Sequence, residues 1–350
     1  MTYDYLVDFP GLGIQDIQLS RIAFRLFGMP IYWYGLLIAF AIILCMLLAM
    51  RQAPKHGLKS EDIMDTFIAI IPLMIVFARL YYVAFEWEYY VEDWKMIFDT
   101  RQGGLGFYGG VIGGALAIWL VTKIKKIKVS ALLDFLVVYV PLGQAIGRWG
   151  NFFNQEAFGN NTTLPWGMYS NQTEAYLKAI GGFDPSAPVH PTFLYEFIAN
   201  MIIFVILYRL RKTSKTPFAI TLWYLLLYGF VRFFVEGIRT DPLLIGDTGI
   251  RVSQLLSALM VIAAIILLTV LRQRRLRREL SAALADEHDV ESADSANDEE
   301  EQVFVEITDD SENVPSEQNT LPAEEPAAPP VEEPETPPVE EPSPEKDKEA

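Results

Sequence analysis

The chain has 350 residues, of which 51% are hydrophobic and 13% aromatic, and its formal net charge is −16. Residues 281–350 contain 24 of the 44 acidic residues and two of the 28 basic ones, so an acidic tail follows a basic, very apolar body. A single cysteine excludes a disulfide framework, and one cysteine with three histidines leaves too few ligands for a zinc site of that kind, so we expect no metal and no cofactor.

Seven segments are apolar enough, and close enough to the ~20 residues required, to cross a bilayer as helices. In chain order they are residues 31–50, 63–85, 104–122, 129–147, 191–208, 217–235 and 252–271. The predicted fold is therefore all-α: a polytopic membrane protein with seven transmembrane helices in a domain of residues 1–280. Residues 281–350 are rich in Glu, Pro and Ser, which predicts a disordered cytoplasmic tail, with the apolar segment 303–307 as its one candidate docking element.

Lysine and arginine are distributed unevenly between the two sides of these spans. The loops after the first, third and fifth spans and the segment after the seventh contain 16 of them, whereas the regions on the other side contain eight. Because cytoplasmic loops carry the excess of basic residues, we predict an extracytoplasmic N-terminus and a cytoplasmic C-terminus.

Charged residues inside a span are costly to bury and are therefore candidates for function. At ~1.5 Å per helical residue, Arg79 in the second span, Arg148 at the end of the fourth and Arg232 in the sixth reach the outer half of the membrane. Tyr34 and Tyr108, at the outer starts of the first and third spans, reach a similar level. The sequence therefore predicts that three arginines converge near the outer surface.

The third span opens with a run of glycines between Gly103 and Gly114. Glycine pairs four residues apart permit close helix packing, which accounts for Gly109 with Gly113 and for Gly110 with Gly114. The earlier glycines predict a non-helical segment that lines a cavity.

The densest polar motif, residues 147–159, follows a fourth span that Pro141 and Gly143 interrupt. It contains the following polar residues: Arg148, Asn151, Asn154 and Glu156. Arginine suits bidentate recognition of a phosphate oxyanion, so the motif favours an anion site. His190, at the start of the fifth span, is equally consistent with a general base and with a positioning hydrogen bond.

The sixth span places Tyr228, Arg232, Glu236 and Arg239 within an arc of about 80° on one helix face. Arginines that snorkel from a helix end, with an Arg–Glu pair inside the helix, would give the same pattern. Arg232 lies too deep to snorkel easily, which favours a functional interpretation for it.

Four segments resemble, in the same order, the motifs of the bacterial prolipoprotein diacylglyceryl transferase family. They are WYG at 33–35, GRWGNFFNQEAFG at 147–159, HPTFLYE at 190–196 and YGFVRFFVEGIR at 228–239. The resemblance covers about residues 25–272. It implies a transferase of the bacterial cell membrane that moves the diacylglyceryl group of phosphatidylglycerol to the lipobox cysteine of a prolipoprotein and releases glycerol-1-phosphate. The implied partners are phosphatidylglycerol, prolipoprotein signal peptides and the bilayer, with no nucleic acid and no cofactor.

The resemblance also implies roles for individual residues. The residues expected to bind phosphatidylglycerol are Arg148, Asn151, Asn154, Glu156, Gly159, Tyr228 and Arg239. Arg232 and Glu236 would form a second essential pair, and Tyr34 would be a tyrosine of the site. Some members have a histidine, proposed as catalytic, in the glycine-rich opening of the third span, where this chain has Tyr108. Our hypothesis is that Arg148 and Arg232 hold the phosphate and that Tyr108 or His190 assists the thiol. Glu236 and Glu156 would hold those arginines or accept a proton.

Two other classes of protein fit parts of the pattern. Broken helices and intramembrane arginines also occur in transporters, here of an anionic solute, but the Gly-Arg-x-Gly-Asn motif occurs once and no two halves of the chain match. A non-catalytic scaffold acting through its acidic tail would lose its function on removal of residues 281–350, whereas an enzyme would keep its activity.

Overall fold

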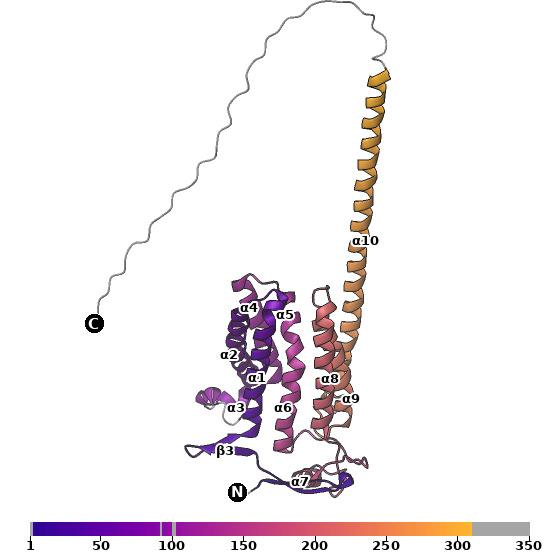
Figure 1. Ribbon diagram of the computed structural model, residues 1–350. Helices are drawn as coiled ribbons and strands as arrows, with labels where there is room; N and C mark the ends of the chain where they lie inside the picture. Colours follow the sequence, from indigo (N-terminus) through magenta and orange to yellow (C-terminus); the bar gives the residue numbers. More distant parts are fainter. Residues whose placement is uncertain (1–2, 92, 100–102, 310–350) are drawn as a thin grey trace, which may run out of the picture. The chain divides into compact units, whose positions relative to one another are not determined.

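The computed structural model describes residues 3–91, 93–99 and 103–309, with the backbone alone for Asp247 and for residues 286–309 (Figure 1). Seven of the described helical segments are long and apolar enough to cross a membrane. They are Trp33–His56, Ser60–Phe85, Phe107–Lys125, Val129–Asn154, Thr192–Thr213, Ala219–Ile238 and Val252–Ala285. The prediction of a mainly helical protein with seven candidate spans is confirmed.

The order in which the helices pack side by side differs from their order along the chain. Helix α2 (Ser60–Phe85) packs on α4 (Phe107–Lys125) and on α1 (Trp33–Gln52), α1 packs on α6 (Val140–Asn154), and α6 on α8 (Thr192–Thr213), which contacts α9 (Ala219–Ile238). Figure 1 shows the same sequence of neighbours across the bundle. Short helical turns occupy the connections: η2 (Ala53–His56), α3 (Trp87–Val91), η3 (Trp94–Phe98) and η5 (Gly246–Thr248).

Glycines bring α4 against α2 as predicted for the pair Gly109 and Gly113. A Cβ atom at Gly109 would lie 2.2 Å from the Phe77 carbonyl oxygen, and one at Gly113 would lie 2.3 Å from that of Leu73. The helix backbones therefore approach more closely than any larger residue would permit.

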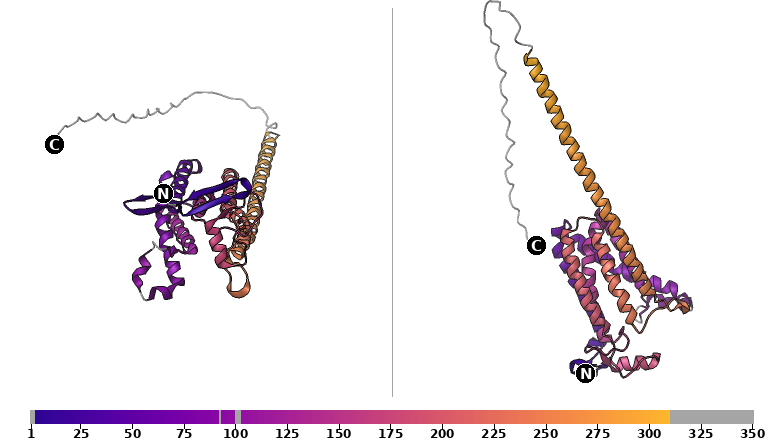
Figure 2. Two further views of the ribbon diagram at one scale, coloured as in Figure 1. Left: turned by 90° about the horizontal axis from the view of Figure 1, so that it is seen from below. Right: turned by 90° about the vertical axis from the view of Figure 1, so that its right-hand side faces the viewer.

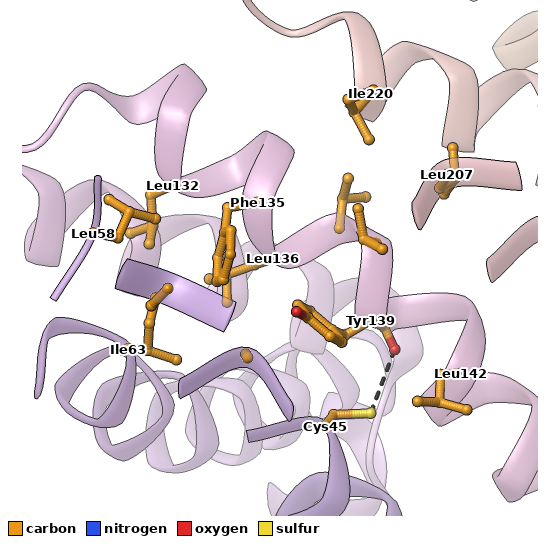
Figure 3. Close-up of a cluster of buried hydrophobic side chains, with 14 of the residues drawn as sticks. Cys45, Leu58, Ile63, Leu132, Phe135, Leu136, Tyr139, Leu142, Leu207 and Ile220 are labelled. Carbon is orange, nitrogen blue, oxygen red and sulfur yellow. Dashed lines mark hydrogen bonds between the residues drawn. The ribbon is translucent and has the colours of Figure 1, made fainter. Parts of the chain in front are cut away.

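The fourth span is broken, as its proline and glycine indicate. It consists of α5 (Val129–Leu136), the 3₁₀ turn η4 (Val137–Tyr139) and α6. Pro141 lies in the first turn of α6, where a backbone N–H would have no acceptor within the helix, so proline costs no hydrogen bond there. The turn is buried in the main hydrophobic core, and the Cys45 thiol donates a hydrogen bond to the Tyr139 carbonyl oxygen over 3.4 Å (Figure 3).

Short strands that the sequence analysis did not predict form at one end of the bundle. Strand β1 (Tyr5–Phe9) pairs antiparallel with β2 (Ile14–Leu19) and β5 (Tyr169–Ser170), and the turn η1 (Pro10–Leu12) follows β1. Strand β3 (Ile22–Leu26) pairs antiparallel with β4 (Met29–Tyr32). Side chains of β1 and β2 share a small core with α7 (Asn171–Ile180) and with the segment after α6. This core includes Val7, Phe158, Met168 and Leu177.

We call this the strand-bearing end of the bundle. The strands lie below the ends of the helices in Figure 1 and in front of them in the left view of Figure 2. The motif of residues 147–159 reaches this end, because the C-terminal end of α6 leads directly into it.

Helix α10 runs from Val252 to Asp309, well past the predicted end of the seventh span. Residues 281–309, for which the composition predicted disorder, have a helical backbone. They contain several alanine and glutamate residues, which favour helix, and the chain has no proline between Pro242 and Pro315. The predicted docking segment 303–307 lies in this helix, and residues 310–350 of the predicted tail lie outside the described residues. The chain divides into two units, Met1–Ala282 and Ala283–Ala350.

Candidate functional site

Four charged side chains from three helices meet in an ion cluster, which we define as Arg148 of α6, Glu196 of α8, and Arg232 and Glu236 of α9. One carboxylate oxygen of Glu196 pairs with the Arg148 guanidinium, and the other lies 3.3 Å from Nη1 of Arg232. Nη2 of Arg232 lies 2.5 Å from a carboxylate oxygen of Glu236. Arg148 and Arg232 thus lie together as predicted, and a shared carboxylate joins them.

The two kinds of side chain in the ion cluster differ in exposure. The side chains of Glu196 and Glu236 are each 3% exposed, whereas those of Arg148 and Arg232 are 19% and 17% exposed. Burying a carboxylate is costly unless a cation pairs with it, and the arginines provide that partner. Each guanidinium has five N–H donors, more than the contacts within the cluster use. An incoming anion would therefore meet guanidinium N–H groups, with the carboxylates behind them.

The residues around Arg148 extend this polar network toward the strand-bearing end. Helix α6 continues to Asn154, seven residues past the predicted end of the span, so Arg148, Asn151 and Asn154 lie on its last turns. Asn151 accepts a hydrogen bond from Arg148 over 3.4 Å and donates one to Glu156 over 2.9 Å. Asn154 also donates to Glu156, over 3.3 Å, and the Glu156 side chain remains exposed.

The segment after α6 has a tightly constrained backbone. Gln155 and Ala157 both adopt positive φ angles, of 50° and 58°, which residues other than glycine rarely do. Gly159 then donates its N–H to the His190 carbonyl oxygen over 2.9 Å and forms a bridge with Arg239. A Cβ atom at Gly159 would lie 2.8 Å from Cβ of His190, so the three segments meet only if this residue is glycine.

Tyr34 is held against α6 by a second glycine. It lies in the first turn of α1, and a Cβ atom at Gly150 would lie 2.2 Å from its ring. Gly150 follows Arg148 by two residues in α6, and Tyr34 stays a predicted residue of the site.

Two of the residues predicted on the α9 face have partners outside the ion cluster. Arg239 follows the last helical residue, Ile238, in an extended conformation and forms a bidentate ion pair with Asp241, with N–O distances of 2.9 and 2.6 Å. Tyr228 stacks on Tyr224 with ring centroids 5.5 Å apart. Arg239 therefore does not lie on the predicted helix face, because α9 ends at Ile238.

Tyr108 and His190, the two candidates for assisting a thiol, make their described contacts away from the ion cluster. The Tyr108 ring lies next to Phe107 and 6.1 Å from the ring of Tyr81. Nδ1 of His190 lies 3.0 Å from the Tyr195 hydroxyl, and burial lowers the pKa of His190 below its usual value. Among the contacts that the structure describes, none joins either residue to Arg148 or Arg232.

Arg79, the third arginine predicted at the outer half of the membrane, makes its described contacts outside the ion cluster. Its guanidinium donates hydrogen bonds to five backbone carbonyl oxygens over 2.6–3.1 Å; they belong to Met96, Ile97, Asp99, Gly103 and Gly104. Met96 and Ile97 lie in the 3₁₀ turn η3, whereas Gly103 and Gly104 lie outside any helix, where carbonyl oxygens need donors from elsewhere. Gly103 and Gly104 are non-helical and line a cavity of about 140 Å³ beside Arg79, as predicted for the opening of the third span.

Glu196 is the member of the ion cluster to which the sequence analysis gave no role. It ends the motif at residues 190–196 and lies inside the span predicted at 191–208. The criterion that identified Arg232, a charge within an apolar span, applies equally to Glu196 and identifies it from the sequence.

Comparisons with known proteins agree with this arrangement of motifs. The family model of prolipoprotein diacylglyceryl transferase matches residues 21–270. Three similar curated proteins are each named phosphatidylglycerol–prolipoprotein diacylglyceryl transferase. That of Clostridioides difficile is 43% identical over 248 residues, that of Finegoldia magna 43% over 250, and that of Enterococcus faecalis 44% over 261. The matched regions cover 71%, 71% and 73% of this chain and 94%, 94% and 92% of the respective relatives.

Proposed function

The chain belongs to the prolipoprotein diacylglyceryl transferase family, and we propose that it transfers the diacylglyceryl group of phosphatidylglycerol to the cysteine thiol of a prolipoprotein lipobox. The observation that carries the assignment of the site is the ion cluster, in which Glu196 joins Arg148 to Arg232. In the reaction the cysteine sulfur attacks the glyceryl carbon and forms a thioether. The carbon–oxygen bond to the phosphate breaks, and glycerol-1-phosphate leaves.

The arginines act on the leaving group in this proposal. Negative charge grows on the phosphate monoester as its bond to carbon breaks, and preoriented guanidinium donors stabilise such charge strongly where water is scarce. Glu196 and Glu236 hold the two guanidinium groups in place rather than reacting themselves, since both carboxylates are buried against arginine. Asn151, Asn154, Gly159 and Tyr228 shape the surroundings of the same head group.

The nucleophile must lose a proton, because the thiolate is the reactive form and an ordinary thiol has a pKa of about 8.5. Guanidinium groups nearby lower that pKa, which reduces the need for a strong base. Glu156 is exposed and hydrogen-bonded by two asparagine amides, so it is placed to accept the proton. Tyr34, Tyr108 and His190 remain candidates for orienting the thiol, and Arg239 for contacting the head group at the rim.

We further propose that the strand-bearing end lies at the outer leaflet of the bacterial cell membrane, with the N-terminus extracytoplasmic. The excess of lysine and arginine at the opposite end supports this orientation. A transporter of an anionic solute is not favoured, since the family match covers residues 21–270 and the named relatives are transferases.

The test is a lipidation assay with the purified full chain, phosphatidylglycerol and a lipobox peptide. Arg148→Ala and Arg232→Ala should each lose more than about tenfold in rate, because a lost charged contact in the transition state is worth ~2–4 kcal/mol. Arg274→Ala removes the same charge from an exposed position of α10 and should leave the rate unchanged. Rates near that of the parent for both cluster variants would refute the assigned site.

The same assay separates the candidates for assisting the thiol. Tyr108→Phe keeps the ring and removes only the hydroxyl, and His190→Gln keeps a hydrogen-bonding side chain but removes the basic imidazole. A loss beyond about tenfold in one of them assigns proton transfer to that residue, since general acid–base catalysis contributes ~100-fold or more. Unchanged rates in both would leave Glu156 as the acceptor, which Glu156→Gln tests directly.

A further inference from the structure

A groove lies at the end of the bundle opposite the strand-bearing end, between α8, α9 and α10. Its volume is about 710 Å³, within the range of sites for small ligands. Apolar side chains line one part of it, among them Trp223 and Leu226 of α9 and Leu268 of α10. Polar side chains line the other part, among them Ser214, Thr216 and Arg272. All of the lining residues belong to the unit Met1–Ala282.

The groove lies past the level at which Gly229 brings α10 close to α9. A Cβ atom at Gly229 would lie 3.1 Å from the Ser257 carbonyl oxygen, and Ser257 and Ala264 are buried there. Beyond Ala264, large apolar side chains that line the groove stay open, with Ile265 50% and Leu276 54% exposed. Helix packing within the unit therefore leaves this apolar surface without a protein partner among the described residues.

The polarity of the groove is graded along the helix axes. Leu268 and Arg272 are one helical turn apart on α10, so an apolar wall gives way to a guanidinium over about 6 Å. Arg275 at the same mouth is paired with Glu279 over 2.7 Å. Among the described side chains none forms an ion pair with Arg272, which is exposed and lines the groove together with Ser214 and Thr216.

We propose that this groove binds an anionic phospholipid. Its phosphate contacts Arg272 and the hydroxyls at the mouth, and one acyl chain lies along Trp223 and Leu226. Arginine is well suited to phosphate oxygens, and basic pockets between transmembrane helices bind anionic lipid head groups. The bound lipid fastens α10 to α8 and α9. It is separate from the substrate lipid, since it lies at the end of the bundle remote from the ion cluster.

A cross-linker at the mouth of the groove tests this proposal. Gln273→Cys introduces an exposed thiol, and the one native cysteine, Cys45, is buried, so a benzophenone maleimide will label position 273 selectively. The labelled full chain is placed in nanodiscs of phosphatidylcholine with a minority of phosphatidic acid. We expect adducts enriched in phosphatidic acid by about fivefold or more over the bulk ratio, because the phosphate gains a charge-assisted contact.

The matched variants are Arg272→Gln and Arg274→Gln, which remove the same charge two residues apart on α10. Arg272→Gln should return the adducts to the bulk lipid ratio, and Arg274→Gln, which does not line the groove, should not. The proposal would be overturned if the two variants changed the lipid ratio equally, or if the parent showed no enrichment. Adducts to residues 283–350 or to a second copy of the chain would also overturn it.

Unlabelled proteins provide a second measurement. Added phosphatidic acid should raise the thermal unfolding midpoint of the parent and of Arg274→Gln but not that of Arg272→Gln, because a ligand of the folded state stabilises it. An equal rise in all three would overturn the proposal. All three should keep the parent lipidation rate, which shows that the site at the other end is folded.

Discussion

Glu196 is the side chain on which the geometry of the ion cluster depends. Its two carboxylate oxygens pair with arginines from two other helices, so it sets the separation of the Arg148 and Arg232 guanidinium groups. Removing one partner from a buried pair is costly because the remaining charge keeps its desolvation penalty. Here Arg148 would lose the carboxylate of its described ion pair, whereas Arg232 would keep Glu236.

We expect Glu196→Gln to lower both stability and activity. The amide has nearly the same size but no charge, so the free energy of unfolding should fall by about 1–3 kcal/mol. The lipidation rate should fall by about tenfold or more as the arginines lose their fixed separation. Thermal unfolding and the peptide assay measure the two effects.

Glu174→Gln is the matched control for that change. Glu174 also pairs with a cation, Lys178, but on the surface of α7, where an ion pair contributes little. Equal behaviour of the two variants would mean that Glu196 does not organise the arginines.

His190 gives the protein a pH dependence of defined sign. Burial lowers the pKa of His190, so the unfolded chain takes up a proton at higher pH than the folded protein does. The stability of the parent should therefore decrease as the pH falls below about 6.5, and the contribution of His190 should vanish above it. The unfolding midpoint of His190→Gln should decline less between pH 8 and pH 5.5 than that of the parent. Parallel declines would show that His190 does not contribute.

At the scale of elements, the break in the fourth span and the segment that follows it place the site. The 3₁₀ turn η4 separates α5 from α6, and α6 alone carries Arg148 and Asn151. After Asn154 the chain forms backbone hydrogen bonds with residues 190 and 238. These bonds bring the start of α8 and the end of α9 to the same level. Glu196 and Arg232 can then meet Arg148.

The packing of α4 on α2 allows a test with adjacent residues. Gly113→Ala would place Cβ 2.3 Å from a backbone oxygen of α2, whereas Gly114→Ala would place it 3.5 Å from the flexible side chain of Met74, an ordinary contact. We expect Gly113→Ala to cost about 1–3 kcal/mol in stability, as overpacking does. Gly114→Ala should be neutral or slightly stabilising, since alanine favours helix. The thermal unfolding midpoints compare the two, and an equal loss would contradict the close approach.

At the scale of the whole molecule, the region shared with the family ends before the acidic tail. The family match ends at residue 270, and the relatives from Clostridioides difficile and Finegoldia magna are each covered over 94% of their length by 71% of this chain. The membrane unit Met1–Ala282 contains every residue of the proposed active site.

Removal of residues 283–350 should therefore leave lipidation intact. We expect the truncated protein to keep its rate within about twofold, because a unit with its own core folds without the segment that follows it. The full chain assayed in the same membrane is the reference. Loss of all activity would favour the alternative in which the protein acts through its tail.

The sequence by itself determined the seven spans, because a lipid environment requires helices of about 20 apolar residues and such runs are visible without a structure. It also predicts a common depth for Arg79, Arg148 and Arg232, since depth follows from the rise of a helix per residue. The motif at residues 147–159 was identified from its density of polar residues, and the pair Arg232 and Glu236 from its spacing on one helix face.

Only the tertiary structure decided which side chains at that depth meet. Lateral neighbours depend on which helices pack together, and residue spacing within one helix carries no information about that choice. Arg79 therefore binds backbone carbonyls beside α4, while Arg148 and Arg232 share Glu196. The pairing of β1 with β5 depends on tertiary structure for the same reason, because the two strands are more than 160 residues apart in the chain.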